Sequence, residues 1–291
     1  MSVHDAFIQS IRDAPDDDVP RLIYADYLEE HGDPVRAEFI RLQCQIARQR
    51  EDENDPAARQ LRSHEYQFLR DHEDAWLGEA APIRKERTFD PTFRRGFVEA
   101  CGIAAPQLLE HATTLMRCMP LWTEATLSRG RGLVRQLVSL PEFSQLRRLT
   151  FAGQLDVEDT RALAGWPGLA ELHSLRFWGG DEREHDREVC NILASSPHTH
   201  GLQLMEMIQV RGGIGSDYRD EDGAAWARRL EKRINARFDR PVFRTSRPFE
   251  KTFAVKSCEG YGFYAGLLPR KYQEVVARDT TGTVRALRTR V

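Results

Sequence analysis

The stretch "LRRLTF", residues 146–151, carries the pattern that decides the fold, because apolar side chains stand at its first, fourth and sixth positions. The same spacing recurs in "LHSLRF" at 172–177 and, with threonine in the first place, in "THGLQL" at 199–204. A degenerate copy, "WTEATL", precedes them at 122–127. A strand-like segment that returns at a period of about 20 to 29 residues is typical of parallel strands stacked side by side.

The copies align on their second apolar position, which is Ala125, Leu149, Leu175 and Leu202, at intervals of 24, 26 and 27 residues. A further interval of 27 residues reaches Val98, inside the strand-like "GFVEACGI". Apolar residues at helical spacing fill the intervals, over residues 106–119, 132–140, 157–164 and 184–193. The sequence therefore predicts an α/β fold: a short solenoid of parallel strands backed by helices.

Side chains of a strand alternate between its two faces, so Leu149 and Phe151 are expected in the core and their neighbours outside. The outward set, on the predicted concave face, is Glu124, Thr126, Arg148, Thr150, Ser174, Arg176, Trp178, Gln203 and Met205. Solenoids bind partners on such faces, and Trp and Arg are enriched at interface hot spots. The candidate partner-binding residues are therefore Arg148, Thr150, Arg176, Trp178, Gln203 and Met205. The alternatives are that Trp178 folds over the sheet edge as a cap, or that the concave face is vacant because a short array has little curvature.

The block "RLIYADYLEEHGDPVRAEFIRLQ", residues 21–43, is the second distinctive stretch, and its apolar spacing predicts two helices. Gly32 is expected to end the first helix, and Asp33-Pro34 to begin the second. Further helices are expected around Phe7 and over residues 56–76. The N-terminal part is thus predicted to be a helical module.

Acidic side chains gather on one face of the first helix of this block. Asp26, Glu29 and Glu30 are three and four residues apart, so they are neighbours on the helix surface. They form a candidate acidic docking surface. Carboxylate metal sites in helical bundles use Glu-x-x-His motifs on facing helices, and none is present in the block. We therefore favour a solvated or docking face over a catalytic or metal site.

The C-terminal part begins with a glycine-rich segment after residue 205, which is expected to be a surface loop. A helix over residues 224–238 and a strand from residue 241 would then close the end of the solenoid. The last 52 residues, 240–291, carry a net charge of +7 and interleave aromatic residues with basic ones. The candidate nucleic-acid contacts there are Lys256, Tyr261, Phe263, Arg270 and Lys271. A short β-hairpin is expected in this extension.

Composition places the chain among ordinary soluble globular proteins, with 291 residues, 41% hydrophobic and 30% charged. Its net charge of -3 hides an acidic head, because residues 1–60 hold fourteen Asp/Glu and only seven Lys/Arg. Five scattered cysteines without a C-x-x-C pair predict reduced thiols in a cytoplasmic protein. Neither an apolar run of membrane length nor the features of a signal peptide stand out, so a membrane location is not expected.

Common catalytic motifs are absent from the sequence. It contains no G-x-S-x-G elbow, H-E-x-x-H helix, Rossmann glycine fingerprint or Walker motif. His198 and His200 are the one close histidine pair, and no third ligand completes a zinc site near them. We therefore expect no catalytic residue, metal, cofactor or small-molecule substrate, with an enzyme of unknown type left as a remaining option.

Residues 21–43 resemble the bacterial repeat-companion domain, through Tyr24-Ala-Asp-Tyr-Leu-Glu-Glu30, Gly32-Asp33 and Glu38-Phe-Ile-Arg-Leu-Gln43. The family more often has Trp where this chain has Tyr27. It is known for preceding leucine-rich repeats, and no catalytic residues are established for it. The strand copies in turn resemble leucine-rich repeats of the ribonuclease-inhibitor-like type. The Asn or Cys that usually follows such a strand is replaced by Gly153-Gln154 and Gly179-Gly180, which puts a regular asparagine ladder in doubt.

Three parts are predicted: a helical module at 1–80, a leucine-rich-repeat-like α/β solenoid at 81–245 and a basic extension at 246–291. The predicted function is a non-enzymatic scaffold that binds a protein partner through the concave strand face, the acidic helices or both. The alternative is a nucleic-acid-associated subunit that uses the basic aromatic tail. The identity of the partner is not encoded in any motif.

Overall fold

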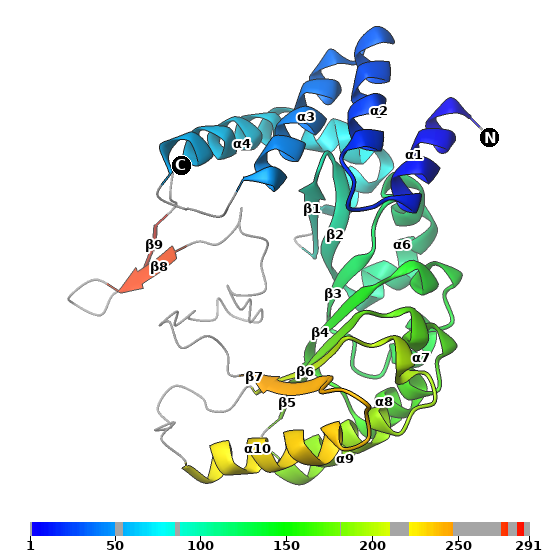
Figure 1. Cartoon of the computed structure of the whole chain (residues 1–291), viewed down its shortest axis with the longest axis vertical. Helices are drawn as coiled ribbons and strands as arrows, with labels where there is room; N and C mark the ends of the chain where they lie inside the picture. Colours follow the sequence, from blue (N-terminus) through cyan, green and yellow to red (C-terminus); the bar gives the residue numbers. More distant parts are fainter. Residues whose placement is uncertain are drawn as a thin grey trace. The chain divides into compact units, whose positions relative to one another are not determined.

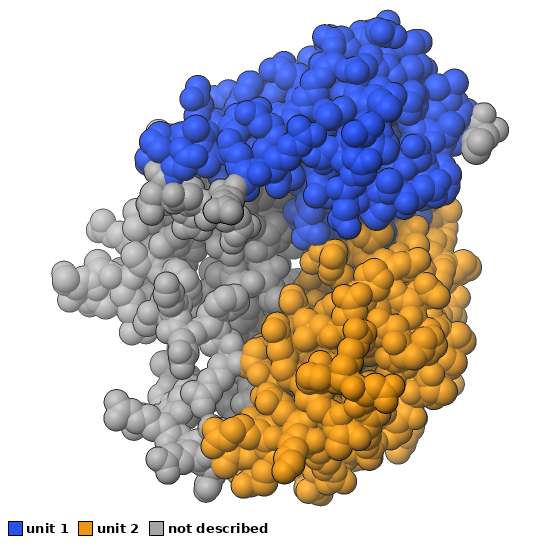
Figure 2. All heavy atoms as spheres, in the orientation of Figure 1, with its two compact units in different colours: residues 1–101, 114–122, 253–291 blue, residues 102–113, 123–252 orange. Residues whose placement is uncertain are grey.

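The computed structural model describes residues 2–49, 55–84, 88–180, 182–209 and 221–246, and two further strands at 275–278 and 284–287. Contacts divide the chain into two compact units (Figure 2). Unit 1 comprises residues 1–101, 114–122 and 253–291, and unit 2 comprises residues 102–113 and 123–252. The boundary therefore falls within a strand and within a helix. The predicted division into three parts stays a prediction.

Helices form most of unit 1 (Figure 1). They are α1 (Val3–Asp13), α2 (Val19–Glu30), α3 (Pro34–Arg48), α4 (Pro56–Leu77) and α5 (Ala81–Arg84), with a 3-10 turn, η1 (Gly78–Ala80), before α5. The four helices predicted in this region are all present. Gly32 ends α2 with a φ of 94°, and the Asp33 side chain accepts from the amide of Arg36 at the start of α3.

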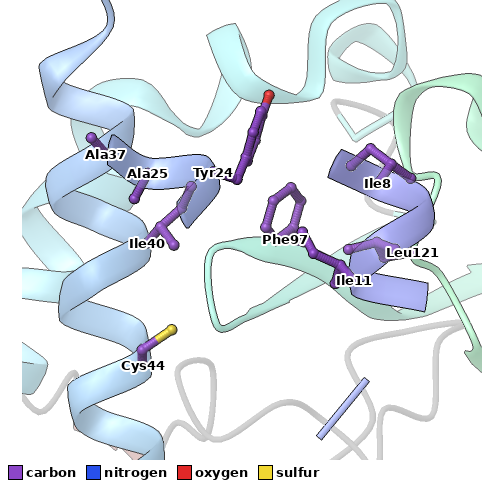
Figure 3. Close-up of a cluster of buried hydrophobic side chains, with 9 residues drawn as sticks. All are labelled: Ile8, Ile11, Tyr24, Ala25, Ala37, Ile40, Cys44, Phe97 and Leu121. Atoms are coloured by element: carbon purple, nitrogen blue, oxygen red, sulfur yellow. The ribbon is translucent and has the colours of Figure 1, made fainter. Parts of the chain in front are cut away.

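The core of unit 1 joins the first three helices to a strand (Figure 3). Its buried members are Ile8, Ile11, Tyr24, Ala25, Ala37, Ile40, Cys44, Phe97 and Leu121. Tyr24 has its hydroxyl 2.7 Å from His4 Nδ1, so the one polar atom of this large ring is satisfied. The aromatic residues of the 21–43 block therefore serve packing.

A strand pair follows these helices; its second strand contains the predicted strand-like segment around Val98, and its first strand was not predicted. β1 (Phe89–Arg94) and β2 (Phe97–Ala104) are neighbours in the sheet and are joined by Arg95 and Gly96, with φ of 47° and 90°. Two positive φ values in a two-residue connection are typical of a type I′ hairpin turn. The hairpin was hard to predict, because its Arg-Gly turn lacks the usual Asn or Asp and because Pro91 interrupts the strand-like pattern of residues 89–94. β1 tolerates this proline because it is the edge strand of the sheet.

One seven-stranded sheet runs in chain order from β1 to β7. The strands of unit 2 are β3 (Glu124–Ser128), β4 (Arg148–Gln154), β5 (Ser174–Gly179), β6 (Leu204–Gln209) and β7 (Phe243–Ser246). These five strands pair in parallel, each with the next. The predicted α/β class is therefore confirmed, with a mostly parallel sheet.

Helices connect the strands and lie along one side of them (Figure 1). They are α6 (Ala105–Cys118), α7 (Val134–Leu137), α8 (Val157–Ala164), α9 (Arg183–Ala194) and α10 (Glu221–Asn235). Short 3-10 turns precede three of the strands: η2 (Pro141–Gln145), η3 (Pro167–Glu171) and η4 (Thr199–Gly201). The helices predicted at 106–119, 157–164 and 184–193 are present. The one predicted at 132–140 is shorter, with four residues.

The strand register agrees with the sequence analysis for three copies and corrects the fourth. Ala125 lies opposite Leu149, and Leu149 opposite Leu175, as their spacing predicts. The next partner of Leu175 is Met205, and not Leu202, which directly follows the preceding 3-10 turn η4. The true interval is therefore 30 residues. Methionine fills core positions as well as leucine does, so the alignment of the fourth copy on Leu202 was wrong and Met205 is the core residue.

Two buried aspartates on the helices satisfy backbone amides that follow the strands. Asp159 in α8 accepts hydrogen bonds from the amide of Gly132 (2.7 Å), in the loop after β3, and from that of Val134 (3.3 Å), the first residue of α7. Asp186 in α9, which is 27 residues further on, accepts from the amide of Gly180 (2.8 Å) after β5. Buried backbone N–H groups need such partners. Carboxylates from the helices thus satisfy backbone amides in the connections after β3 and β5.

Two strands are described in the C-terminal extension, β8 (Val275–Arg278) and β9 (Val284–Leu287), which pair antiparallel as a separate sheet. The rest of the extension from residue 247 onward lies outside the described residues. The predicted packing of this segment on the preceding units therefore stays a prediction.

Burial of the thiols leads to a first prediction. Cys44, Cys101 and Cys190 are at most 3% exposed, whereas Cys118 at the end of α6 is partly exposed. Burial raises the pKa of Cys44 to about 11 and also raises the pKa of Cys190. Since the thiolate is the nucleophile, iodoacetamide at neutral pH should modify Cys118 well before the other three.

The experiment uses a Cys258→Ser variant, in which only these four thiols remain, and follows modification by peptide mass spectrometry. Addition of urea should expose all four thiols together and provides the control. Alkylation of native Cys44 at the rate of Cys118 would contradict the packing described for unit 1.

Candidate functional site

The strand side chains of unit 2 that point away from the buried core form a mixed polar and apolar surface. We call it the outer strand face, and it comprises Glu124, Thr126, Arg148, Thr150, Ser174, Arg176, Trp178, Leu204, Glu206, Ile208 and Arg244. The alternate residues are buried, as Leu149, Leu175 and Met205 illustrate with 0% exposure. The alternation of the strands thus sorts a hydrophobic core from a face that carries chemistry.

A buried carboxylate flanked by two arginines is the most ordered part of this face. Glu206 on β6 lies opposite Arg176 on β5 and Arg244 on β7. Its two oxygens are 2.9 Å from Arg176 Nε and 2.7 Å from Arg244 Nε. The Glu206 side chain is 7% exposed, against 39% and 56% for the two arginines. Arg244 Nε donates a charge-assisted hydrogen bond to this carboxylate, whereas Arg176 Nε forms an ion pair with it without a hydrogen bond.

A second arginine-glutamate pair lies on the neighbouring strands. Arg148 on β4 is opposite Glu124 on β3, with Arg148 Nη1 3.9 Å from Glu124 Oε2. Arg148 is again the more exposed partner, with 55% of its side chain accessible against 27% for Glu124. Thr150, the next outward residue of β4, is buried at 8% exposure, which limits its direct contact with a partner.

An apolar group lies beside these charges. Trp178 on β5 is opposite Ile208 on β6, and both side chains are partly exposed. Leu204, also partly exposed, is opposite Ser174. Trp178 lies within β5 (Ser174–Gly179), where its partly exposed side chain alternates with the buried Phe177 and Gly179. The face therefore combines an aromatic anchor with arginines, a pairing common at interface hot spots.

The corrected register changes which β6 residues belong to this face. Met205 was expected to point outward, but it is fully buried and opposite Leu175. Gln203 is exposed but precedes β6, so it is not part of the strand ladder. Glu206 and Arg244 were not predicted as members of this face. Moving the fourth copy by three residues, from Leu202 to Met205, places Glu206 among the outward side chains, and this shift is the sequence signal that would have identified Glu206.

The acidic helical surface of unit 1 is partly neutralised by a neighbouring helix. Asp26, Glu29 and Glu30 are exposed on α2, as expected. Arg41 on α3 donates through Nη2 to both Asp26 Oδ1 and Glu29 Oε2, each at 2.6 Å. These bonds raise the pKa of Arg41, that to Asp26 contributing most. Two of the three candidate docking carboxylates are thus already engaged within the unit.

The candidate nucleic-acid contacts, which are Lys256, Tyr261, Phe263, Arg270 and Lys271, all lie outside the described residues. The nucleic-acid alternative therefore stays a prediction.

Across the described ranges, no group of three or more His, Cys, Asp or Glu side chains is arranged to hold a metal ion. In the same part of the chain, none of the helices has both the length and the apolar character needed to span a bilayer.

Comparisons with known proteins add no relative on which function could be argued. Neither a protein-family model, nor a curated protein, nor a solved structure matches this chain.

Proposed function

We propose that this protein is a non-enzymatic scaffold that binds a protein partner through the outer strand face. In this proposal β3 to β7 and their helices form a short leucine-rich-repeat solenoid of the ribonuclease-inhibitor-like type, and residues 21–43 belong to a repeat-companion module. The parallel pairing of the strands and the L-x-x-L spacing of their anchors support the solenoid.

The observation that carries the proposal is the side-chain order on the outer strand face. Arg176 and Arg244 both form ion pairs through Nε with one buried carboxylate, and Trp178 lies two residues from Arg176 on the same strand face. Side chains that are held in place before binding lose less conformational entropy when a partner docks. A solvated surface without a role has no comparable need for a carboxylate that is 7% exposed.

The proposal is tested by affinity purification with mass spectrometry from the native host. A Trp178→Ala, Arg176→Ala double variant should lose the specific partners of the wild type, because it removes the aromatic anchor and one arginine. The control is Arg161→Ala, Arg187→Ala, which removes two exposed arginines from α8 and α9. Thermal melting should first establish that both variants are folded. Retention of every wild-type partner by the outer-face variant would reject the proposal.

A further inference from the structure

On the outer strand face the arginine side chains are more exposed to solvent than the glutamate side chains. Glu206 and Glu124 are the carboxylates of this face, with side-chain exposures of 7% and 27%. Arg176, Arg148 and Arg244 lie beside or above them with exposures of 39%, 55% and 56%. The accessible part of the face is therefore cationic, although its five charged groups nearly balance.

The two arginines around Glu206 keep most of their hydrogen-bonding capacity. A guanidinium group has five N–H donors, one on Nε and four on the Nη atoms. Arg176 and Arg244 meet Glu206 through Nε, and within the described part of the chain their Nη atoms form neither a hydrogen bond nor an ion pair. The Nη pair of each guanidinium is free to bind a carboxylate in the bidentate geometry that arginine favours.

We propose that the outer strand face binds an acidic segment of a protein partner, with carboxylates on Arg176 and Arg244 and an apolar side chain on Trp178 and Ile208. This inference rests on the proposed function and specifies the chemistry of its partner. Trp178 and Ile208 lie opposite each other, two residues along their strands from Arg176 and Glu206. An extended segment therefore meets cationic and apolar groups in succession.

A nucleic acid fits this face less well than an acidic protein segment. A nucleic-acid backbone presents one phosphate after another and is bound by neutralising many of them. Here only three arginines are available, and the carboxylates of Glu124 and Glu206 lie between or beneath them. Discrete carboxylates separated by apolar side chains match the spacing of this face better.

The test uses a fluorescein-labelled polyglutamate peptide with a central leucine, and fluorescence anisotropy with the full chain. The wild type should bind it. Arg176→Gln, Arg244→Gln should weaken binding by about tenfold or more, because two charged hydrogen-bonding groups are lost. The matched pair Arg161→Gln, Arg187→Gln on α8 and α9 should leave binding unchanged. Should the first pair fail to fold, Ser174→Glu places an added carboxylate on the same face, removes no ion pair and should weaken binding similarly.

Three results would overturn the inference. The first is that the wild type does not bind the polyglutamate peptide. The second is that Arg161→Gln, Arg187→Gln weakens binding of the peptide as much as Arg176→Gln, Arg244→Gln does. A labelled oligothymidylate could also bind with an affinity that depends on Arg176 and Arg244, which would assign the face to nucleic acid. If the wild type does not bind the polyglutamate peptide, but partners from the native host are lost from the Trp178→Ala, Arg176→Ala variant, the acidic-partner inference fails and the proposed function stands.

Discussion

Gly201→Ala should destabilise the protein by about 3 kcal/mol, which is the size expected when a well-packed contact is overfilled and the backbone must move. Gly201 ends η4, and a Cβ built there would be 1.8 Å from the backbone oxygen of Ala170 in η3. Real Cβ contacts essentially never fall below 3.0 Å. Because the obstructing atom belongs to the backbone, no side-chain rotation relieves the clash.

The measurement is urea unfolding of the full chain, and Gly153→Ala on β4 is the matched control. A Cβ at Gly153 would have no neighbouring atom within 4 Å, and its φ does not lie in the left-handed region. That variant should be as stable as the wild type or slightly more so, since alanine restricts the unfolded chain. Equal stability of the two variants would show that Gly201 does not lie against the backbone of Ala170 in η3.

Local pattern in the sequence was sufficient for the parts of the fold that repeat regularly. Leu149 and Leu175 are spaced like their neighbours and are paired across β4 and β5, so their register followed from counting. Met205 broke the pattern, because side-chain volume rather than the identity of leucine determines what a core position accepts. Counting alone could not detect that substitution.

The candidate site is formed by residues that are distant in the sequence, and only some of them could be predicted to belong to it. Arg176 and Trp178 could be placed on the outer strand face from alternation along a single strand. Glu206 could not be recognised as their organising carboxylate, since its pairing with Arg244 joins residues that are 38 positions apart. From sequence alone, a glutamate in a strand is ordinarily expected to face solvent. The register of β5, β6 and β7 shows that Glu206 lies between Arg176 and Arg244.

Arg21, the first residue of the 21–43 block, illustrates the same limit in unit 1 and leads to the second large prediction. It is 1% exposed, although an arginine is rarely buried so fully. Its Nη2 donates to Glu99 Oε1 on β2 at 2.6 Å and to the backbone oxygen of Pro15 at 3.1 Å. The ring of Phe97 lies 5.6 Å from its Cζ. This arginine therefore joins α2 to the β1-β2 hairpin.

Arg21→Met should cost about 3 kcal/mol of stability, because it leaves Glu99 as a largely buried charge without its main partner. Burial already raises the pKa of Glu99, and Arg21 is the charge that opposes this rise most. Without Arg21 the pKa of Glu99 should rise further. A carboxyl whose pKa is higher in the folded protein is destabilising above that pKa, and the cost disappears as pH falls through it.

The loss relative to wild type should therefore be larger at mildly alkaline than at mildly acidic pH, as measured by urea unfolding at both. Glu99→Gln removes the buried charge, so the double variant Arg21→Met, Glu99→Gln should recover stability, with a coupling free energy of about 2 kcal/mol. Arg59→Met, on the exposed side of α4, controls for loss of an arginine and should have little effect. If Arg21→Met is equally destabilising at both pH values and Glu99→Gln restores nothing, the pair does not hold α2 on the hairpin. The arginine would then act through its packing against Phe97 alone, since the long aliphatic stem of arginine buries apolar area whatever happens to its charge.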